Sequence, residues 1–145
     1  ITEAIDEAAA NADAKAIVFR VDSPGGSALA SDLVWQATQR AREKKPVVVS
    51  MSDVAGSGGY YVAAGATRIL AQPTTLTGSI GVVFTRPEIS GLLDRLGVSS
   101  ETLARGRYAR LNDLTAPFDA ATRDKLLEEI EHIYQVFVDR VARGR

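Results

Sequence analysis

One serine in the sequence has the surroundings of a catalytic nucleophile. Ser57 stands in the middle of the run A-G-S-G-G at 55–59, shortly after the apolar stretch 47–51. A hydroxyl held on a tight turn between a strand and a helix is exposed to substrate. Small neighbours let a substrate backbone approach closely. The pattern therefore favours nucleophilic catalysis by Ser57.

A second glycine-rich turn, D-S-P-G-G-S at 22–27, follows another apolar stretch. Sites in open α/β sheets lie beyond the carboxyl ends of the strands. Both turns lead into predicted helices, whose first N–H groups have no partner within the helix. The N–H of Gly58, with a second from Gly25 or Gly26, would form an oxyanion hole, in which one donor is worth roughly 10²–10³ in rate. The alternative to an oxyanion hole is that both turns are ordinary strand-to-helix connections without a catalytic role.

Other chemistries find less support. Glycine turns at helix starts can bind phosphate, but neither turn contains a dinucleotide or P-loop motif. The sequence has no cysteine, which excludes disulfides, thiolate metal sites and a cysteine nucleophile. Its net charge of −1 and its lack of a basic stripe give no indication of nucleic-acid binding.

The sequence offers no evident general base for Ser57. The sole histidine, His132, falls off the apolar stripe of the last predicted helix. A serine–lysine dyad needs a lysine whose pKa is lowered to roughly 7–8, and arginine does not lose its proton. Four lysines are present, and all are interpreted as solvated surface charges: Lys15, Lys44, Lys45 and Lys125.

Strands alternate with helices along the chain, which predicts an α/β fold with a mainly parallel sheet flanked by helices. Strands are predicted at 16–21, 47–51 and 68–71, with an irregular strand at 76–84 and a weaker pattern at 100–105. Helices are predicted at the N-terminus, from Ala30 to the basic cluster 42–45, at 60–66, at 87–97 and, after a polar loop at 106–118, from Asp119 as a long C-terminal helix.

The 145 residues suit one domain. No stretch reaches the roughly 20 apolar residues of a membrane span, and no signal peptide opens the chain. Residues 1–15 have the pattern of a helix already under way. We therefore expect the chain to be part of a longer protein, with any membrane anchor outside it.

Several motifs together resemble one family of serine peptidases. They are K-A-I-V-F-R-V-D-S-P-G-G-S-A-L-A-S at 15–31, K-P-V-V-V-S-M at 45–51, A-G-S-G-G-Y-Y-V-A at 55–63, T-L-T-G-S-I-G-V-V at 75–83 and F-V-D-R-V-A-R-G-R at 137–145. Nearly the whole chain is similar to the signal peptide peptidase A family, within the Clp protease/crotonase fold. S-P-G-G alone is shared with Clp proteases, whereas the combination is specific.

The resemblance implies roles for four residues. Ser57 matches the nucleophile, Gly25 and Gly58 match the oxyanion donors, and Ser79 matches a serine that orients the lysine ammonium. For Ser79 the alternative is a turn residue that satisfies its own backbone. The family uses no metal and no cofactor. The tyrosines that follow the nucleophile are interpreted as core aromatics without a functional role.

The chain departs from the family at the lysine. Short members carry it where this sequence has Ala109, in G-R-Y-A at 106–109. Long members are tandem duplications, in which the first half supplies the lysine and the second half the serine. This chain resembles the second half. We therefore expect 1–145 to be a single catalytic domain that is inactive alone and borrows its lysine base from a missing N-terminal half.

The resemblance also implies a setting and a substrate. The expected protein is a homo-oligomer, a tetramer, anchored in the bacterial cell membrane with its protease domain on the extracytoplasmic side. Its expected substrates are cleaved signal peptides and other hydrophobic peptides. Four residues are candidates for an apolar substrate pocket, although core packing explains each as well: Leu29, Leu76, Ile80 and Val82.

Two other functions stay open. The chain could be a non-catalytic scaffold that keeps the fold without the chemistry, as the missing base suggests. It could also be a crotonase-like acyl-CoA enzyme, which would use two backbone donors in the same way. The serine at the corner has no purpose in that enzyme, and no acidic pair lies near the glycine turns.

Overall fold

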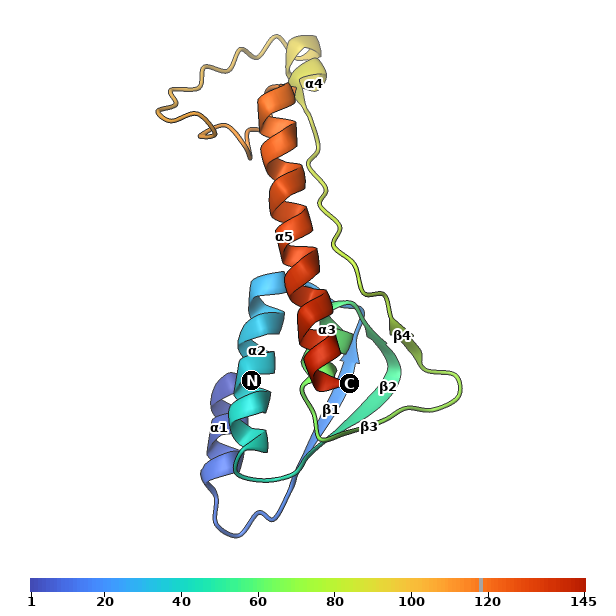
Figure 1. Cartoon of the computed structure of the whole chain (residues 1–145). Helices are drawn as coiled ribbons and strands as arrows, with labels where there is room; N and C mark the ends of the chain where they lie inside the picture. Colours follow the sequence, from blue (N-terminus) through green and yellow to red (C-terminus); the bar gives the residue numbers. More distant parts are fainter. Residues whose placement is uncertain (118) are drawn as a thin grey trace. The chain divides into compact units, whose positions relative to one another are not determined.

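The computed structural model describes residues 1–117 and 119–145 and has helices and strands in the order predicted for an α/β fold (Figure 1). The helices are α1 (Thr2–Ala10), α2 (Ala28–Arg42), α3 (Gly58–Ala64), α4 (Ser90–Arg95) and α5 (Ala120–Gly144). The strands are β1 (Ile17–Ser23), β2 (Val47–Gly56), β3 (Arg68–Leu70) and β4 (Leu76–Gly78). The predicted long C-terminal helix is confirmed.

The chain forms two compact units. The first contains 1–82 together with 133–145, and the second contains 83–132. All four strands belong to the first unit. The expectation that 1–145 is one catalytic domain stays a prediction.

The sheet of the first unit is parallel throughout. Its order is β1-β2-β3, and β4 pairs with the far end of β2. Ser23 is aligned with Ala55, and Gly56 is aligned with Gly78. The carboxyl ends of β1, β2 and β4 therefore meet at one edge. As predicted, both glycine-rich turns lie at this edge.

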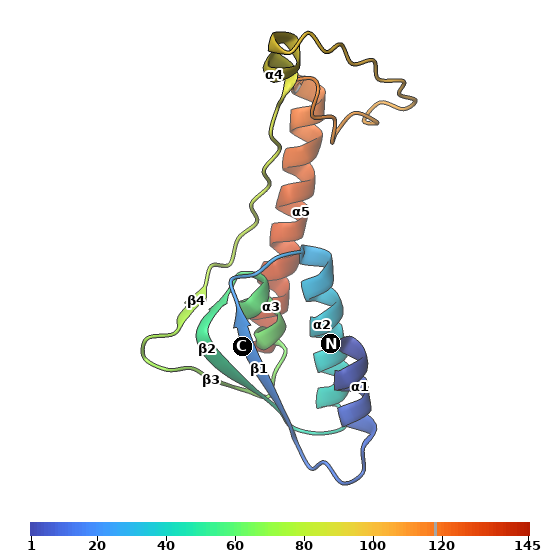
Figure 2. The same cartoon turned by 180° about the vertical axis from the view of Figure 1, so that it is seen from behind.

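One face of the sheet carries the core. Inward-facing side chains of β1 and β2 pack against α1, α2 and α3, which lie on the same side of the sheet (Figure 2). Val47 and Val49 are fully buried there. On the opposite face Val18 is 73% exposed and Leu70 is 58% exposed. The run of β-branched residues in these strands does not reveal how many faces of the sheet are covered.

Other boundaries also differ from the predictions. β2 continues five residues beyond 51 and includes the first two residues of the run 55–59. The strand predicted at 76–84 ends at Gly78, where Gly78 and Ser79 both have positive φ. The helix predicted at 87–97 begins only at Ser90, and 100–105 forms no strand.

In the second unit, the loop before α5 is held by its own polar contacts. The Asp113 carboxylate accepts hydrogen bonds from Thr115 Oγ1 at 2.7 Å and Arg110 Nε at 2.8 Å. The Arg86 guanidinium donates to the backbone oxygens of Asp113 and Ala116. These contacts order a loop for which the sequence predicted no regular structure.

The predicted helix cap at Asp119 is confirmed. Its carboxylate accepts a hydrogen bond from the backbone N–H of Thr122 at 2.7 Å, which satisfies one of the free donors at the start of α5. No helix in the described parts of the chain is both long enough and apolar enough to cross a membrane.

Candidate active site

Ser57 alone makes the turn between β2 and α3. Its backbone has φ 49° and ψ −117°, a region that non-glycine residues rarely occupy. Among the described residues, Ser79 is the only other non-glycine residue with positive φ, at 52°. Such strain costs about 1–3 kcal/mol per residue and clusters at functional sites. Ser57 is the expected nucleophile, and Ser79 is the residue that the family resemblance expects to orient the lysine.

Two backbone hydrogen bonds hold the strained turn. Ser57 N–H donates to the Gly78 carbonyl at 2.9 Å, and the Ser57 carbonyl accepts from Tyr61 N–H at 2.8 Å. The turn is thus fixed both by the end of β4 and by the first turn of α3. Because its own N–H is engaged, Ser57 cannot use that group as an oxyanion donor.

The two glycine-rich turns touch one another. A Cβ built on Gly25 would lie 2.8 Å from Ser57 Cβ, 3.1 Å from Ser57 Oγ and 3.0 Å from Gly58 N. A Cβ built on Gly58 would lie 2.5 Å from Ser31 Oγ. At position 25 only glycine allows this approach, whereas a side chain at position 58 would require Ser31 Oγ to move. The structure thus brings together Ser57, Gly25 and Gly58.

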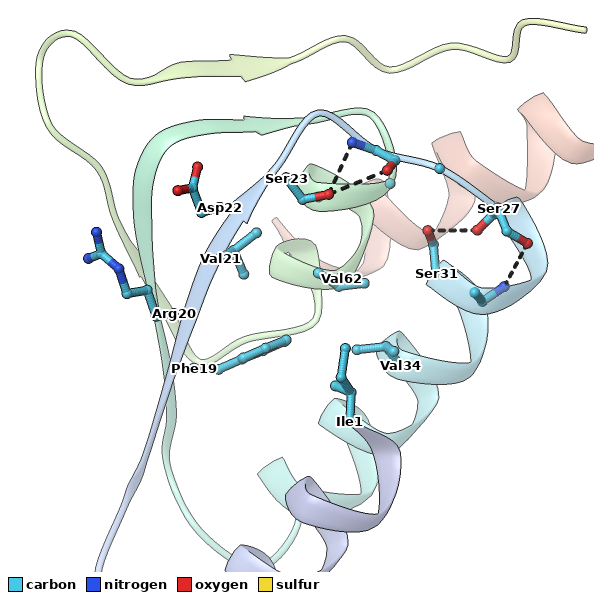
Figure 3. Close-up of a pocket in the computed structure, with 15 residues that line it drawn as sticks. Ile1, Phe19, Arg20, Val21, Asp22, Ser23, Ser27, Ser31, Val34 and Val62 are labelled. Carbon is cyan, nitrogen blue, oxygen red and sulfur yellow. Dashed lines mark hydrogen bonds between the residues drawn. The ribbon is translucent and has the colours of Figure 1, made fainter.

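The amides around Ser57 differ in what they bond. Gly58 N–H, at the start of α3, has no acceptor within the described chain. Gly25 N–H donates to Ser23 Oγ at 3.2 Å (Figure 3). Gly26 N–H has no acceptor among the same residues, and its nitrogen is 3.3 Å from the Cβ position built on Gly58. The N–H groups of Gly58 and Gly26 are therefore free to donate a hydrogen bond to a substrate, whereas Gly25 N–H would first have to break its hydrogen bond to Ser23 Oγ.

Ser79 lies next to the strand that leads to Ser57. Its Cβ is 3.8 Å from a Cβ built on Gly56, and it follows Gly78, whose carbonyl holds Ser57. No hydrogen bond from its hydroxyl to its own backbone is present in the described structure. Its role in orienting an amine stays a prediction.

No lysine of the first unit contacts Ser57 in the described structure. The hydroxyl of Ser57 has no hydrogen-bond partner there, and His132 is exposed. Lys15 Nζ donates to the Ala12 carbonyl, and Lys45 Nζ donates to the Ala8 carbonyl. Lys125 pairs with Glu128 at 3.1 Å.

A cavity of about 300 Å³ lies beside the glycines of the two turns (Figure 3). Gly25, Gly26 and Gly58 line its mouth, and its walls are mostly apolar: Phe19, Val21, Val34 and Val62. These wall residues come from the inner faces of β1, α2 and α3. The sequence missed them because they carry the ordinary pattern of a core.

The apolar residues that the sequence proposed for a substrate pocket are not in this cavity. Leu29 is 72% exposed in the first turn of α2, and Leu76 is 71% exposed on β4. Ile80 is also exposed, and Val82 is half-buried. For Leu29, Leu76 and Ile80 the alternative of core packing is wrong, because these side chains are exposed, and their role in a substrate pocket stays a prediction.

Comparison with known proteins decides the family. The model of peptidase family S49 matches residues 39–145, well over half of the sequence. The chain belongs to peptidase family S49. The resemblance to signal peptide peptidases, drawn above from the motifs, is thereby confirmed.

Relatives of this S49 chain carry protease names. It is 46% identical over 132 residues to the chloroplastic serine protease SPPA of Arabidopsis thaliana, and 37% identical over 132 residues to Protease 4 of Haemophilus influenzae. Each alignment covers 90% of this chain but only 20% and 21% of the relative. The chain thus spans about a fifth of the length of these proteins.

Among solved structures, an enoyl-CoA hydratase/isomerase from Acinetobacter baumannii is similar in fold. The TM-score is 0.48 at 17% identity, over 97% of this S49 chain and 83% of the other. These values are too low to bear on activity.

Tyr61, to which the sequence assigned no role, has a shifted pKa. Its buried hydroxyl donates to Asp32 Oδ1 at 2.7 Å. Burial and this hydrogen bond raise the pKa of Tyr61 to about 12, against about 10 for an unperturbed tyrosine. A raised pKa means that its contribution to stability is complete below pH ~10 and is lost as the pH rises toward 12.

We therefore expect the free energy of unfolding to fall between pH 10 and 12 in part because of Tyr61. Urea unfolding across this range, with tyrosinate absorbance recorded alongside, measures the effect. Tyr61→Phe should flatten the dependence, and Tyr60→Phe should leave it in place. Equal curves for wild type and Tyr61→Phe would show that the hydroxyl is not held as described.

Proposed function

We propose that this chain is the nucleophile-bearing domain of a serine endopeptidase. Its substrates are signal peptides already cleaved from secreted proteins, and other hydrophobic peptides. The observation that carries the proposal is the strained turn at Ser57, with Gly25 and Gly58 packed against it. Strain of this kind persists only where the surrounding structure enforces it. Membership of family S49 supports the same conclusion.

In the proposed mechanism, Ser57 Oγ attacks the scissile carbonyl carbon and its proton passes to a neutral lysine amine. The C–O bond to Ser57 forms, and the carbonyl oxygen becomes an oxyanion that accepts hydrogen bonds from Gly58 N–H and from the loop at 25–26. Collapse breaks the C–N bond, and the lysine ammonium returns the proton to the leaving amine. Water then hydrolyses the acyl-enzyme by the same route.

The lysine comes from outside this chain in our proposal, and the hydroxyl of Ser79 orients it. Four findings support an external base: His132 is exposed, and Lys15, Lys45 and Lys125 bond elsewhere. A lysine serves as base only when desolvation lowers its pKa to roughly 7–8. The closing of the site by a second, lysine-bearing half would provide that desolvation.

The cavity beside the glycines supports a hydrophobic substrate. Its walls offer Phe19, Val21, Val34 and Val62 to a side chain next to the scissile bond. We further propose a membrane-anchored homo-oligomer, a tetramer, at the bacterial cell membrane with the protease domain on the extracytoplasmic side. In that arrangement an anchor outside this chain would hold the site near peptides released from the membrane.

Two assays of the full-length protein test this function. One uses a fluorogenic hydrophobic peptide as substrate, and the other uses an acyl-CoA. Peptide cleavage with fluorophosphonate labelling at Ser57 is the expected result. A protein that cleaves no peptide and takes no label at Ser57 would instead be a scaffold, the function that the missing base favours. Turnover of the acyl-CoA alone would point to a crotonase-like enzyme.

A further inference from the structure

A polar cluster joins three helices behind the proposed nucleophile. Asp32 on α2 accepts hydrogen bonds from Tyr61 Oη on α3 at 2.7 Å and from Arg140 Nε on α5 at 3.1 Å. Gln36 also donates to the Asp32 carboxylate. We name Asp32, Tyr61 and Arg140 the Asp32 cluster.

Aromatic side chains enclose the cluster. The Arg140 guanidinium lies over the ring of Trp35, 4.2 Å from its centroid. The rings of Tyr61 and Phe137 are 4.7 Å apart. Trp35, Tyr61 and Phe137 are all buried. The three polar groups therefore meet in partly dry surroundings, where hydrogen bonds are strong and a missing partner is costly.

The charges in the cluster are matched. Burial raises the pKa of Asp32, but hydrogen bonds from Tyr61 and Gln36 and the charge of Arg140 outweigh it, so the pKa lies below its usual value. Asp32 is therefore ionised at neutral pH. A charged group with several fixed donors favours one arrangement of the helices that supply them.

The same helices carry the two sides of the proposed oxyanion hole. Tyr61 N–H holds the Ser57 carbonyl at 2.8 Å, so the cluster is one helical turn from the nucleophile. On α2, Asp32 follows Ser31, whose Oγ bonds the Ser27 carbonyl at 2.9 Å and faces Gly58. The Asp32–Tyr61 bond therefore joins α2 and α3 close to the point where Gly25 and Gly58 meet.

We propose that the Asp32 cluster is a positioning device that sets the spacing between the glycine loop at 25–26 and Gly58. The inference rests on the proposed function, because spacing matters only if these amides hold an oxyanion. Catalytic groups must be held within about 0.5 Å of their productive positions. A small slide of α3 along α2 would move Gly58 away from the loop without unfolding either helix.

The test uses the full-length protein and removes one hydroxyl. Tyr61→Phe should lower kcat for peptide cleavage about 10-fold and change KM less than 2-fold, because a single hydrogen bond worth about 1.4 kcal/mol corresponds to a factor of ten. The rate of acylation by a fluorophosphonate should fall in parallel. Tyr60→Phe, one residue earlier on the same helix, is the control and should leave both rates unchanged.

Two further variants protect the test against loss of folding. Arg140→Lys keeps the charge but loses the planar fork, and should lower kcat by a smaller factor. Asp32→Ala combined with Tyr61→Phe should be no slower than Asp32→Ala alone, because Asp32→Ala already removes the acceptor of the Tyr61 hydroxyl. All rates are measured well below the melting temperature of each variant.

The possible outcomes separate this inference from the proposed function. Suppose that Ser57→Ala is inactive, whereas Tyr61→Phe and Arg140→Lys keep the wild-type kcat and have a lower melting temperature. The cluster would then only stabilise the fold, and the inference would be wrong. If Ser57→Ala cleaves peptide as well as wild type, the proposed function itself fails. A double variant Asp32→Ala/Tyr61→Phe that is slower than Asp32→Ala alone would also overturn the inference.

Discussion

Replacing Ser57 by alanine in the full-length protein is expected to lower kcat for peptide cleavage by at least about 10⁴-fold. The substitution removes the oxygen that would attack the carbonyl and leaves the amide donors of the turn in place. Substrate affinity should change little, because the cavity beside the glycines is untouched. Steady-state kinetics with a fluorogenic hydrophobic peptide measures both quantities.

A matched control is available on the same strand. Ser50 on β2 is half-buried and belongs to the same sheet, so Ser50→Ala removes one hydroxyl without approaching the turn. It should keep the wild-type kcat. A Ser57→Ala protein that cleaves the peptide at a rate close to wild type would remove Ser57 from the mechanism.

Replacing Gly25 by alanine is expected to lower kcat by at least about 10², because the clash would displace Ser57 and the Gly58 amide, and misplacing one oxyanion donor alone has an effect of this size. The new Cβ would lie 2.8 Å from Ser57 Cβ and 3.0 Å from Gly58 N, distances that real Cβ atoms hardly ever show. Backbone on both sides would have to shift, since neither neighbour is the end of a flexible side chain. The φ of +118° adds strain for any residue with a Cβ.

Gly26→Ala separates the clash from the strain. Gly26 also has positive φ, at 152°, but a Cβ built there meets nothing within 4 Å. We expect a loss of stability of about 1 kcal/mol from backbone strain and a fall in kcat of less than 10-fold. Equal losses of activity in the two variants would show that contact between Gly25 and Ser57 does not limit the reaction.

The turn at Ser57 could be predicted because its causes are local. Small residues on both sides of Ser57, between an apolar run and a helical pattern, are enough to indicate a strand-to-helix corner. The length of β2 could not be predicted in this way. Residues 52–56 have a turn-like composition, and they form a strand because Val54 and Gly56 pair with Leu76 and Gly78, about 22 residues away.

Features that depend on distant residues were missed. The partner of Asp32, Arg140, is 108 residues away in sequence, and neither residue interrupts the amphipathic pattern of its helix. The hydrogen bond from Gly25 N–H to Ser23 Oγ depends on a loop conformation that the motif S-P-G-G does not specify. The wall residues of the cavity were missed because they line the helix–sheet interface and carry the ordinary pattern of a core.

The central claim is that Ser57 Oγ attacks the substrate while the free amide of Gly58 holds the oxyanion. A crystal structure of the full-length protein with a peptide boronic acid tests it most directly. We expect a covalent bond from Ser57 Oγ to boron and a boronate oxygen about 2.7–3.1 Å from Gly58 N. A boronate bound to another residue, or one whose oxygens point away from Gly58 and from the loop at 25–26, would contradict the account.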